Sequence, residues 1–262
     1  MRIKKYTSDL RAEDWQRIEP LIPVRRRSKW PLEQVVNGIL YVLKNGCGWR
    51  DLPGEFPCWN TVHYYFAKWG KEGVWENINA CLVVDYREKT PVDEKKNAEP
   101  TTLILDSQSV KNSATATEQV GFDGGKLIKG RRRFVLIDTS GATVATCVLP
   151  ANVHDGQTAL AWWAKLAHHP LLSQVKRIFI DGGFRGEFVK KMAKLYRIEV
   201  TVPQKVVRQA GKFCVHATRW VVERSISWIT NNRRLARCYE RKVANEESFI
   251  LSCNIRRIVK MC

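Results

Sequence analysis

The chain has 262 residues, 44% of them hydrophobic, which is enough for one large domain or for a small domain beside a medium one. No stretch approaches the roughly 18 to 20 apolar residues that a membrane-spanning helix needs, and the charged start MRIKKYTSDL does not resemble a signal peptide, so we expect a cytoplasmic protein with no membrane partner. The eight cysteines are scattered singly, without CxxC pairs or zinc-ligand spacing, which argues against a disulfide framework and a structural zinc site.

Positive charge is concentrated in the second part of the chain, although the formal net charge of the whole is +18. Residues 1–99 hold 17 Lys and Arg against 14 Asp and Glu, a net charge of +3, whereas residues 100–262 hold 27 against 12, a net charge of +15. A domain this basic favours a polyanionic partner, because neutralising phosphates releases counterions and drives association. We therefore expect the partner to be a nucleic acid.

The first part, residues 1–97, predicts helices only. A short helix fits residues 8–20, and residues 32–46 place apolar side chains at helical spacing before Gly46 ends the helix. A third helix is predicted over residues 60–73, after a connection rich in Pro, Gly and aromatic residues. A helix, a glycine-containing connection and a basic, aromatic helix are typical of a helix-turn-helix-like DNA-binding domain. An ordinary three-helix bundle that packs on its neighbour is the alternative interpretation.

Residues 87–102 are charged, contain prolines and lack periodicity, which predicts a linker to a second domain over residues 98–262. In that domain, apolar runs predict strands and amphipathic patterns predict helices. The predicted strands are 101–108, 131–141, 142–150, 175–183 and 198–204, and the predicted helices are 154–168, 184–196, 216–232 and 245–259. Three strands followed by alternating helices and strands are typical of a mixed α/β sheet with helices on both faces.

Three of the predicted strands end in an aspartate, at Asp106, Asp138 and Asp181. A carboxylate that leaves a buried strand needs hydrogen bonds, a cation or a metal ion, because a bare charge there is costly. Asp138 precedes Thr-Ser-Gly, which predicts a hairpin turn. Asp181 precedes two glycines, which suits either a turn or a ligand site at the carboxyl end of a strand. Asp106 precedes no turn cluster, which favours a functional role.

An acidic cluster inside so basic a domain predicts a metal site that faces a phosphodiester. Neighbouring carboxylates raise one another's pKa unless a divalent cation neutralises them. Mg²⁺ prefers oxygen ligands and binds one or two protein carboxylates together with substrate phosphate. Such ions activate water or a 3′-hydroxyl group and stabilise the leaving oxygen. Surrounding positive charge would hold the nucleic acid, and the run Arg131, Arg132 and Arg133 is a candidate for phosphate contacts.

A third acidic ligand is predicted in the helix over residues 216–232. At 100° per residue, a polar stripe about 60° wide contains Arg219, Glu223, Thr230 and Arg234, and apolar side chains lie on the other side of the helix. Glu223 therefore lies one turn after Arg219 on this stripe. An i, i+4 salt bridge on a solvated face is the alternative interpretation.

The chain resembles the DDE transposases of bacterial insertion sequences in three segments, LILDSQSVK, IFIDGGFRG and RWVVERSISWITNNRRLARCYE. These segments resemble the blocks that carry the first Asp, the second Asp and the Glu of that family. The resemblance is greatest to the IS5 family within the broader IS4-like group, and it covers nearly the whole chain. Residues 32–69 resemble the amino-terminal DNA-binding region of these proteins.

The resemblance implies an RNase H-like catalytic fold and divalent-metal-dependent cutting and joining of DNA at terminal inverted repeats. Carried over by position, Asp106, Asp181 and Glu223 would form the catalytic, metal-binding triad, with two Mg²⁺ or Mn²⁺ ions. Double-stranded DNA, as inverted repeats and as target, would be the partner of a homodimer in the synaptic complex, associated with the bacterial nucleoid. Arg185, close to the second Asp, would reach the phosphate.

The chain departs from the Y-x2-R-x3-E-x6-K signature of the wider group at two positions. Arg219 matches the arginine and is a candidate DNA contact, whereas His216 stands in the tyrosine position and Thr230 in the lysine position. Arg233 and Arg234 follow one turn later and resemble the RRL of the IS5-like subgroup, so either could contact DNA near the cleaved bond. Two other functions stay open: a metal-dependent DNA nuclease without strand transfer, and an inactive DNA-binding regulator with a purely structural acidic cluster.

Overall fold

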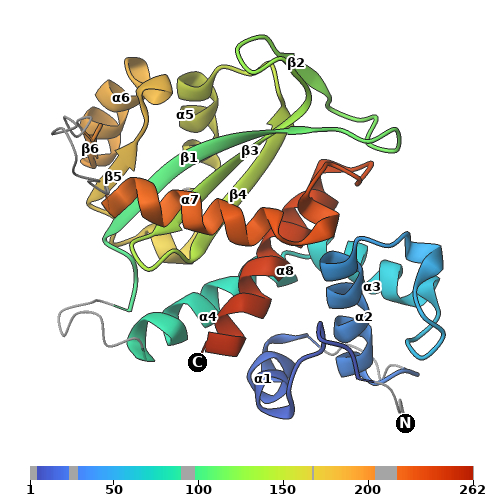
Figure 1. The fold of residues 1–262 in the computed structure, drawn as a ribbon. Helices are drawn as coiled ribbons and strands as arrows, with labels where there is room; N and C mark the ends of the chain where they lie inside the picture. The colour runs from blue at the N-terminus through green and yellow to red at the C-terminus, as the bar shows by residue number, and fades with distance from the viewer. Residues whose placement is uncertain (1–4, 24–28, 90–97, 167, 204–216, 262) are drawn as a thin grey trace, which may run out of the picture.

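The computed structural model describes residues 5–23, 29–89, 98–166, 168–203 and 217–261, and it combines a helical region with a mixed sheet (Figure 1). The helices of the first part are α1 (Ala12–Ile18), α2 (Leu32–Asn45), α3 (Trp59–Lys71) and α4 (Val74–Lys89). No strand occurs among the described residues before position 98, so the predicted all-helical character of the first part is confirmed.

Helix α2 agrees closely with its predicted range. Its apolar residues, among them Val35, Ile39 and Leu43, are fully buried, as the helical spacing requires. Gly46 ends the helix in the left-handed conformation, with φ of 72°, which a residue without a side chain adopts at little cost. Helix α3 follows a connection that contains the short 3-10 helix η2 (Trp49–Asp51).

Helix α4 is the element of the first part that the sequence pattern did not predict. Gly73, with φ of 71°, separates it from α3. Its buried face mixes apolar residues such as Trp75 with the polar Asn79 and Arg87, which hides the apolar periodicity. The helix continues to Lys89, and residues 90–97 of the predicted linker lie outside the described residues.

The described part of the chain forms one mixed sheet of six strands. The strands are β1 (Thr102–Lys111), β2 (Gly121–Asp123), β3 (Ile128–Asp138), β4 (Thr143–Pro150), β5 (Arg177–Ile180) and β6 (Glu199–Thr201). Their order is β2-β3-β1-β5-β6, with β4 also paired to β3. Strand β1 is antiparallel to β3 and parallel to β5, which confirms the predicted mixed sheet. The short strand β2 was not predicted, because three residues carry too little pattern.

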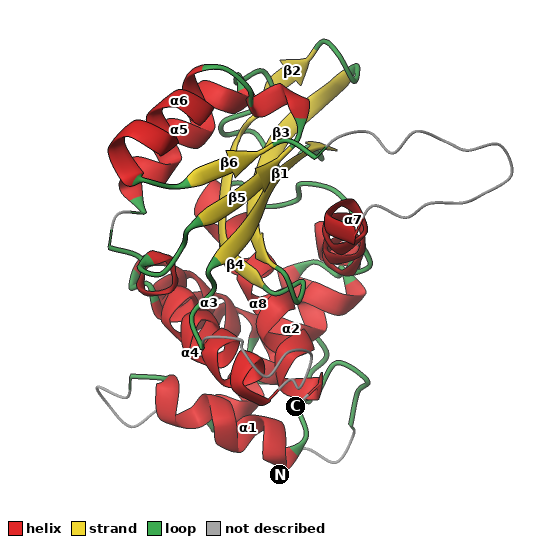
Figure 2. Ribbon diagram, turned by 90° about the vertical axis from the view of Figure 1, so that its left-hand side faces the viewer, coloured by secondary structure: helices red, strands yellow, loops and turns green. Residues whose placement is uncertain are grey.

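Helices cover both faces of the sheet. Helices α5 (Asp155–Lys165) and α6 (Glu187–Tyr196) lie on one face, and α7 (Ala217–Thr230) crosses the other (Figures 1 and 2). Helix α8 (Val243–Met261) begins against the sheet, where Glu246 pairs with Arg131 of β3, and continues among the helices of the first part. Helix α7 ends at Thr230. Arg234, which was predicted to lie on the polar stripe of this helix, therefore lies beyond its end.

The main hydrophobic core contains residues of both the helical region and the sheet. Asn254 of α8 donates a hydrogen bond to Asn79 of α4 at 2.7 Å, and Asn79 donates to the carbonyl oxygen of Thr143 in β4 at 2.9 Å. All three residues are buried. The predicted division at residues 97 and 98 therefore separates sequence segments that share one packed interior.

Candidate active site

Asp106 lies in β1, and Asp181 directly follows β5, the parallel neighbour of β1. Strand β5 pairs with β1 in a register that aligns Leu105 with Ile180, so the next residue of each chain segment is an aspartate. Neighbouring parallel strands lie about 4.8 Å apart, and aligned residues point to the same face. Topology thus brings together two of the three acidic residues that the sequence predicted as ligands.

The environment of Asp106 is unfavourable for a negative charge. Burial raises the pKa of Asp106 to about 6, and the nearby carboxylates of Asp181 and Asp155 add to this rise, while the Ser107 N–H partly offsets it. That N–H donates a hydrogen bond to Asp106 Oδ1 at 2.7 Å. A cation placed between Asp106 and Asp181 would reduce this unfavourable interaction, as expected of a divalent-metal site.

Asp181 begins the short 3-10 helix η4 (Gly182–Phe184) and is exposed. Its Oδ1 accepts a hydrogen bond from the Gly183 N–H at 2.9 Å, so the residue does form the turn that the sequence suggested. Around the Cβ position of Gly182 nothing lies within 4 Å, so the backbone of the loop is open at this residue. The turn and the ligand interpretations of Asp181 are therefore compatible.

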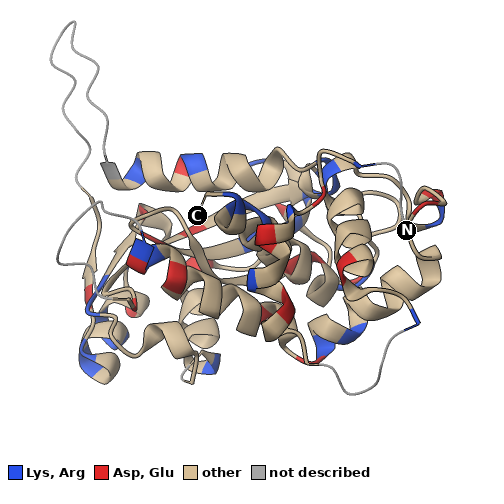
Figure 3. Ribbon diagram, turned by 90° about the horizontal axis from the view of Figure 1, so that it is seen from below, with Lys and Arg blue, Asp and Glu red and all other residues tan. Residues whose placement is uncertain are grey.

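Glu223 lies on the outer face of α7, paired with Arg219 at 2.8 Å, and the two side chains are 62% and 79% exposed. Figure 3 shows acidic and basic residues next to each other on this helix. The salt-bridge interpretation is thus what the structure displays for Glu223. Within the described ranges, no three His, Cys, Asp or Glu side chains are arranged to hold a metal ion, so the structure joins the two aspartates and leaves Glu223 apart.

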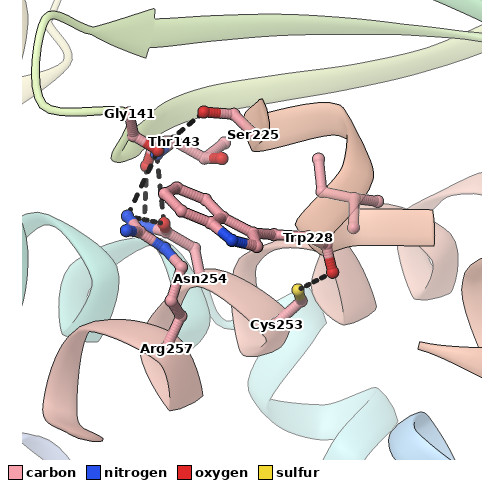
Figure 4. A pocket seen from close by; sticks show the side chains of 8 residues that line it. Gly141, Thr143, Ser225, Trp228, Cys253, Asn254 and Arg257 are labelled. Carbon is pink, nitrogen blue, oxygen red and sulfur yellow. Dashed lines mark hydrogen bonds between the residues drawn. The ribbon is translucent and has the colours of Figure 1, made fainter. Parts of the chain in front are cut away.

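The opposite side of α7 is anchored to α8 and to the hairpin between β3 and β4 (Figure 4). The carbonyl oxygen of Gly141 accepts hydrogen bonds from Ser225 Oγ at 3.0 Å and from Arg257 Nη2 at 3.2 Å. The Arg257 guanidinium also stacks on Trp228, 4.2 Å from the ring centroid. The cavity between these residues measures about 10 Å³, which is room for one water at most. The residues therefore pack α7 against its neighbours and do not form a ligand pocket.

The run Arg131 to Arg133 is inside the protein, which corrects the prediction that it contacts DNA phosphates. Arg131 and Arg133 are 0% and 1% exposed, and both pair with the buried Glu246 of α8, at 2.9 and 2.7 Å. Arg132 points to the other face and pairs with Asp123 at 2.6 Å and Asp155 at 2.7 Å. A basic run on a central strand is buried whatever its charge, so each guanidinium is neutralised by a carboxylate.

Arg234 is likewise engaged in the interior, against the prediction of a DNA contact. Its guanidinium pairs with Glu240 at 2.5 Å, donates to the carbonyl oxygen of Cys47 at 3.1 Å and stacks near the Trp49 and Tyr239 rings. It therefore links the segment after α7 to the helical region.

The other predicted DNA contacts keep accessible side chains. Arg185, Arg219 and Arg233 are exposed. They remain available to a phosphate, and Arg219 would have to leave Glu223 to reach one. His216 lies outside the described residues.

Asp155 and Asp123 are residues that sequence reasoning missed. Both contact Arg132, and Asp155 also accepts a hydrogen bond from Ser107 Oγ at 3.1 Å. The only signal in the sequence was an aspartate at the start of the predicted helix 154–168, a position that usually means helix capping. Nothing in the pattern linked it to Arg132, because the link is made across the sheet.

None of the helices in the described ranges combines the length and the apolar character that a membrane span requires.

Comparisons with known proteins agree with this arrangement. The family model described as "Putative transposase of IS4/5 family" matches residues 10–79, and the model described as "Transposase DDE domain" matches residues 97–255. The chain is also similar to the "Insertion element IS402 uncharacterized 16.2 kDa protein" of Burkholderia cepacia, with 35% identity over 109 residues, which are 38% of this chain and 70% of that protein.

Proposed function

Since the chain belongs to the DDE transposases of the IS4/5 insertion-sequence family, we propose that it cuts and joins the ends of its element by metal-dependent phosphodiester hydrolysis and strand transfer. The family and the mixed α/β sheet together confirm the predicted RNase H-like fold. The substrates would be terminal inverted repeats and a target duplex, bound by a dimer.

The observation that carries this proposal is the alignment of two aspartates at the junction of β1 and β5. Asp106 and Asp181 directly follow the aligned residues Leu105 and Ile180, and burial together with the neighbouring carboxylates raises the pKa of Asp106 to about 6. This environment disfavours the ionised form of Asp106, and a hard cation bound there would stabilise it. The donor chemistry therefore fits Mg²⁺ or Mn²⁺.

Asp106 and Asp181 would hold the divalent ions, with Glu223 as the third ligand. Ions bound there supply charge neutralisation at the scissile phosphate and activation of the attacking hydroxyl group. The loop after Asp181 leaves open space for the DNA backbone, and Arg185 is exposed close to it. Arg185 would orient the phosphate by paired hydrogen bonds.

Glu223 must exchange its partner to join the site. It now pairs with Arg219 on a solvated face, and such a pair stabilises the fold by no more than about 1 kcal/mol. A DNA phosphate that attracts Arg219 would free the Glu223 carboxylate at low cost. We infer that DNA binding and completion of the triad are coupled through this pair.

The amino-terminal helices would read the ends of the element. Helix α3 exposes Asn60 and Tyr64, with Tyr64 58% exposed, on one side of the helix. Lys68 lies 5.9 Å from the Tyr64 ring centroid, and Arg50 lies 5.4 Å from the Trp59 ring centroid. Basic and aromatic side chains of this kind suit contacts with phosphates and base edges.

The test compares Asp106→Asn and Asp181→Asn with the wild type on labelled duplexes taken from the two ends of the element. We expect both variants to bind the duplexes with unchanged affinity and to lose Mg²⁺-dependent cleavage by a factor of at least about 1,000, as for removal of a central catalytic group. A variant that cleaves at the wild-type rate would contradict the assignment of its aspartate.

A strand-transfer assay with pre-cleaved ends separates the alternatives. A transposase joins these ends to a target plasmid, whereas a nuclease cuts and does not join. An inactive regulator would bind the duplexes without cutting them. Its Asp181→Asn variant would behave like the wild type with every divalent metal ion. Joining that requires Asp106 and Asp181 would exclude both alternatives.

A second experiment locates the DNA-reading surface. Residues 28–75 are exchanged for those of a relative whose element has different terminal sequences. The chimaera should then prefer the terminal sequences of that relative. If the preference stays with the original ends, the amino-terminal region is not the reader.

A further inference from the structure

Asp155 is the first residue of α5 and lies where the sheet meets the loop after Asp181. Its Oδ1 accepts hydrogen bonds from Ser107 Oγ at 3.1 Å and from Arg132 Nη1 at 2.7 Å. Ser107 directly follows Asp106 in β1. The bond from Ser107 therefore fixes the strand next to the first proposed catalytic aspartate.

The other oxygen of Asp155 lies against the loop that carries the second one. A Cβ atom added to Gly183 would lie 3.1 Å from Asp155 Oδ2 and 3.2 Å from Asp181 Oδ1, so the two carboxylates flank the same glycine. The Gly183 N–H donates to Asp181 at 2.9 Å. A side chain at position 183 would require the Asp155 carboxylate to shift by a few tenths of an ångström.

Arg132 holds Asp155 in this position. Its guanidinium, 11% exposed, bridges Asp155 at 2.7 Å and Asp123 at 2.6 Å. Asp123 in turn accepts hydrogen bonds from Ser109 Oγ at 2.5 Å and from the Lys126 N–H at 3.1 Å. A continuous chain of charged contacts thus runs from the turn between β2 and β3 to the segments that carry the catalytic aspartates.

Asp155 supports the site from the opposite face of the sheet. Ser109 and Arg132 are aligned on β1 and β3, and Ser107 lies on the same face as Ser109, two residues away. Asp106 is offset by one residue from Ser107, so its side chain points to the other face. Asp155 therefore reaches the catalytic carboxylates through their neighbours and not as a ligand between them.

We propose that Asp155 is a positioning residue of the transposase, which sets the spacing of Asp106 and Asp181 through its hydrogen bond from Ser107 and its position against the loop at Gly183. The inference rests on the proposed function of those two aspartates. Residues that orient metal ligands typically change metal affinity by about 10- to 100-fold when they are replaced. Loss of the Asp155 charge should accordingly weaken divalent-ion binding and leave DNA binding intact.

The experiment measures Mn²⁺ binding without DNA, as the rise in melting temperature during a Mn²⁺ titration. We expect Asp155→Asn to need about tenfold more Mn²⁺ than the wild type for half of the maximal rise. Cleavage of the end duplexes should fall at low Mn²⁺ and recover at high Mn²⁺, with unchanged affinity for the duplexes.

Glu187→Gln is the matched control, because Glu187 is the first residue of the adjacent helix α6 and pairs only with Lys191 among the described residues. It removes the same charge from the same helical position, and its Mn²⁺ midpoint should equal that of the wild type. An Asp155→Asn midpoint equal to that of the control would overturn the proposal.

Asp181→Asn separates this inference from the proposed function. If Asp181→Asn keeps both the Mn²⁺ response and cleavage, the proposed function fails. If it loses both while Asp155→Asn keeps the wild-type midpoint, only the positioning role fails. Should Asp155→Asn not fold, Ser107→Ala removes a single hydrogen bond to the same carboxylate and must raise the midpoint, and no rise there contradicts the proposal equally.

Discussion

The two faces of strand β3 use the same residue type for different purposes. On the face toward α8, Arg131 and Arg133 converge on one buried carboxylate, Glu246. On the face toward α5, Arg132 divides its guanidinium between Asp123 and Asp155 and so reaches the candidate active site. Successive side chains of a strand point to opposite faces of the sheet. Two of these three consecutive arginines therefore hold α8 on the sheet, and the one between them holds Asp155 near the candidate active site.

The ion pairs on the face toward α8 should contribute strongly to the stability of the fold. Arg131 also donates to the carbonyl oxygens of Glu240 and Arg241, each at 2.7 Å, so the α8 face fixes the end of the chain onto the sheet. Although burial opposes ionisation, Arg133 and the hydrogen bonds around it keep the pKa of Glu246 below its usual value. Breaking a buried pair of this kind costs more than breaking an exposed one, because the remaining charge is left without compensation.

Replacing Glu246 by Ala should give the largest effect on stability. Two buried guanidiniums would lose their carboxylate, and we expect the free energy of unfolding to fall by about 3–5 kcal/mol in urea titrations. Glu199→Ala, which breaks the exposed pair with Arg177, is the control and should change it by less than about 1 kcal/mol. Equal losses in the two variants would remove the distinction between interior and surface pairs.

The neighbouring carboxylate of Glu247, unlike that of Glu246, should destabilise the folded protein when it is ionised. Burial raises the pKa of Glu247 to about 7, and the hydrogen bond from the Val148 N–H offsets only part of this rise. The folded protein therefore binds more protons than the unfolded chain between about pH 4.5 and pH 7, and its stability falls as the pH rises through this window.

Glu247→Gln keeps the acceptor for Val148 and removes the charge. We expect the variant to be more stable than the wild type by up to about 3 kcal/mol at pH 8, and to be equally stable at pH 4. The measurement is urea unfolding at a series of pH values. A gain that does not change with pH would mean that ionisation of Glu247 is not its cause.

Arg132→Lys should have a moderate effect on stability and a clear effect on the site. A lysine can pair with one carboxylate and cannot bridge two, so we expect a loss of about 1–2 kcal/mol and a higher Mn²⁺ requirement. Arg133→Lys, on the other face, should lower stability at least as much without changing the Mn²⁺ midpoint. If both substitutions shift the midpoint alike, the two faces of β3 are not functionally distinct.

Breaking the Arg219–Glu223 pair on α7 should have the smallest effect on stability. Arg219→Ala breaks an exposed i, i+4 contact with Glu223, and we expect the free energy of unfolding to change by less than about 0.5 kcal/mol. DNA cleavage should nevertheless fall, because Arg219 would no longer draw a phosphate toward the site. Unchanged cleavage would contradict the coupling proposed between this pair and DNA.

Much of the second domain was predictable from local pattern. The apolar runs that end at Asp106 and Asp181 identify their strands, and the parallel pairing of these strands then places the two aspartates together. Helix α4 was not predictable in this way, because Asn79 and Arg87 on its buried face interrupt the apolar spacing.

The role of the arginine run was beyond local pattern for a physical reason. Its partner Glu246 is more than 100 residues away on α8, and the pairing depends on where α8 returns to the sheet. Charge counted along the sequence predicts a surface, whereas burial of a central strand places the same charges in the interior. Asp155 was missed similarly, since its contact with Arg132 exists only across the folded sheet.

The place where a divalent ion binds on the protein can be mapped by cleavage of the polypeptide itself. Fe²⁺ in place of Mg²⁺, with ascorbate and peroxide, cuts the polypeptide close to the bound ion, and the fragments identify the nearby residues. We expect cuts next to Asp106 and Asp181 that excess Mg²⁺ suppresses and that Asp181→Asn abolishes. Cuts elsewhere in the chain, unaffected by the substitution at Asp181, would contradict the account.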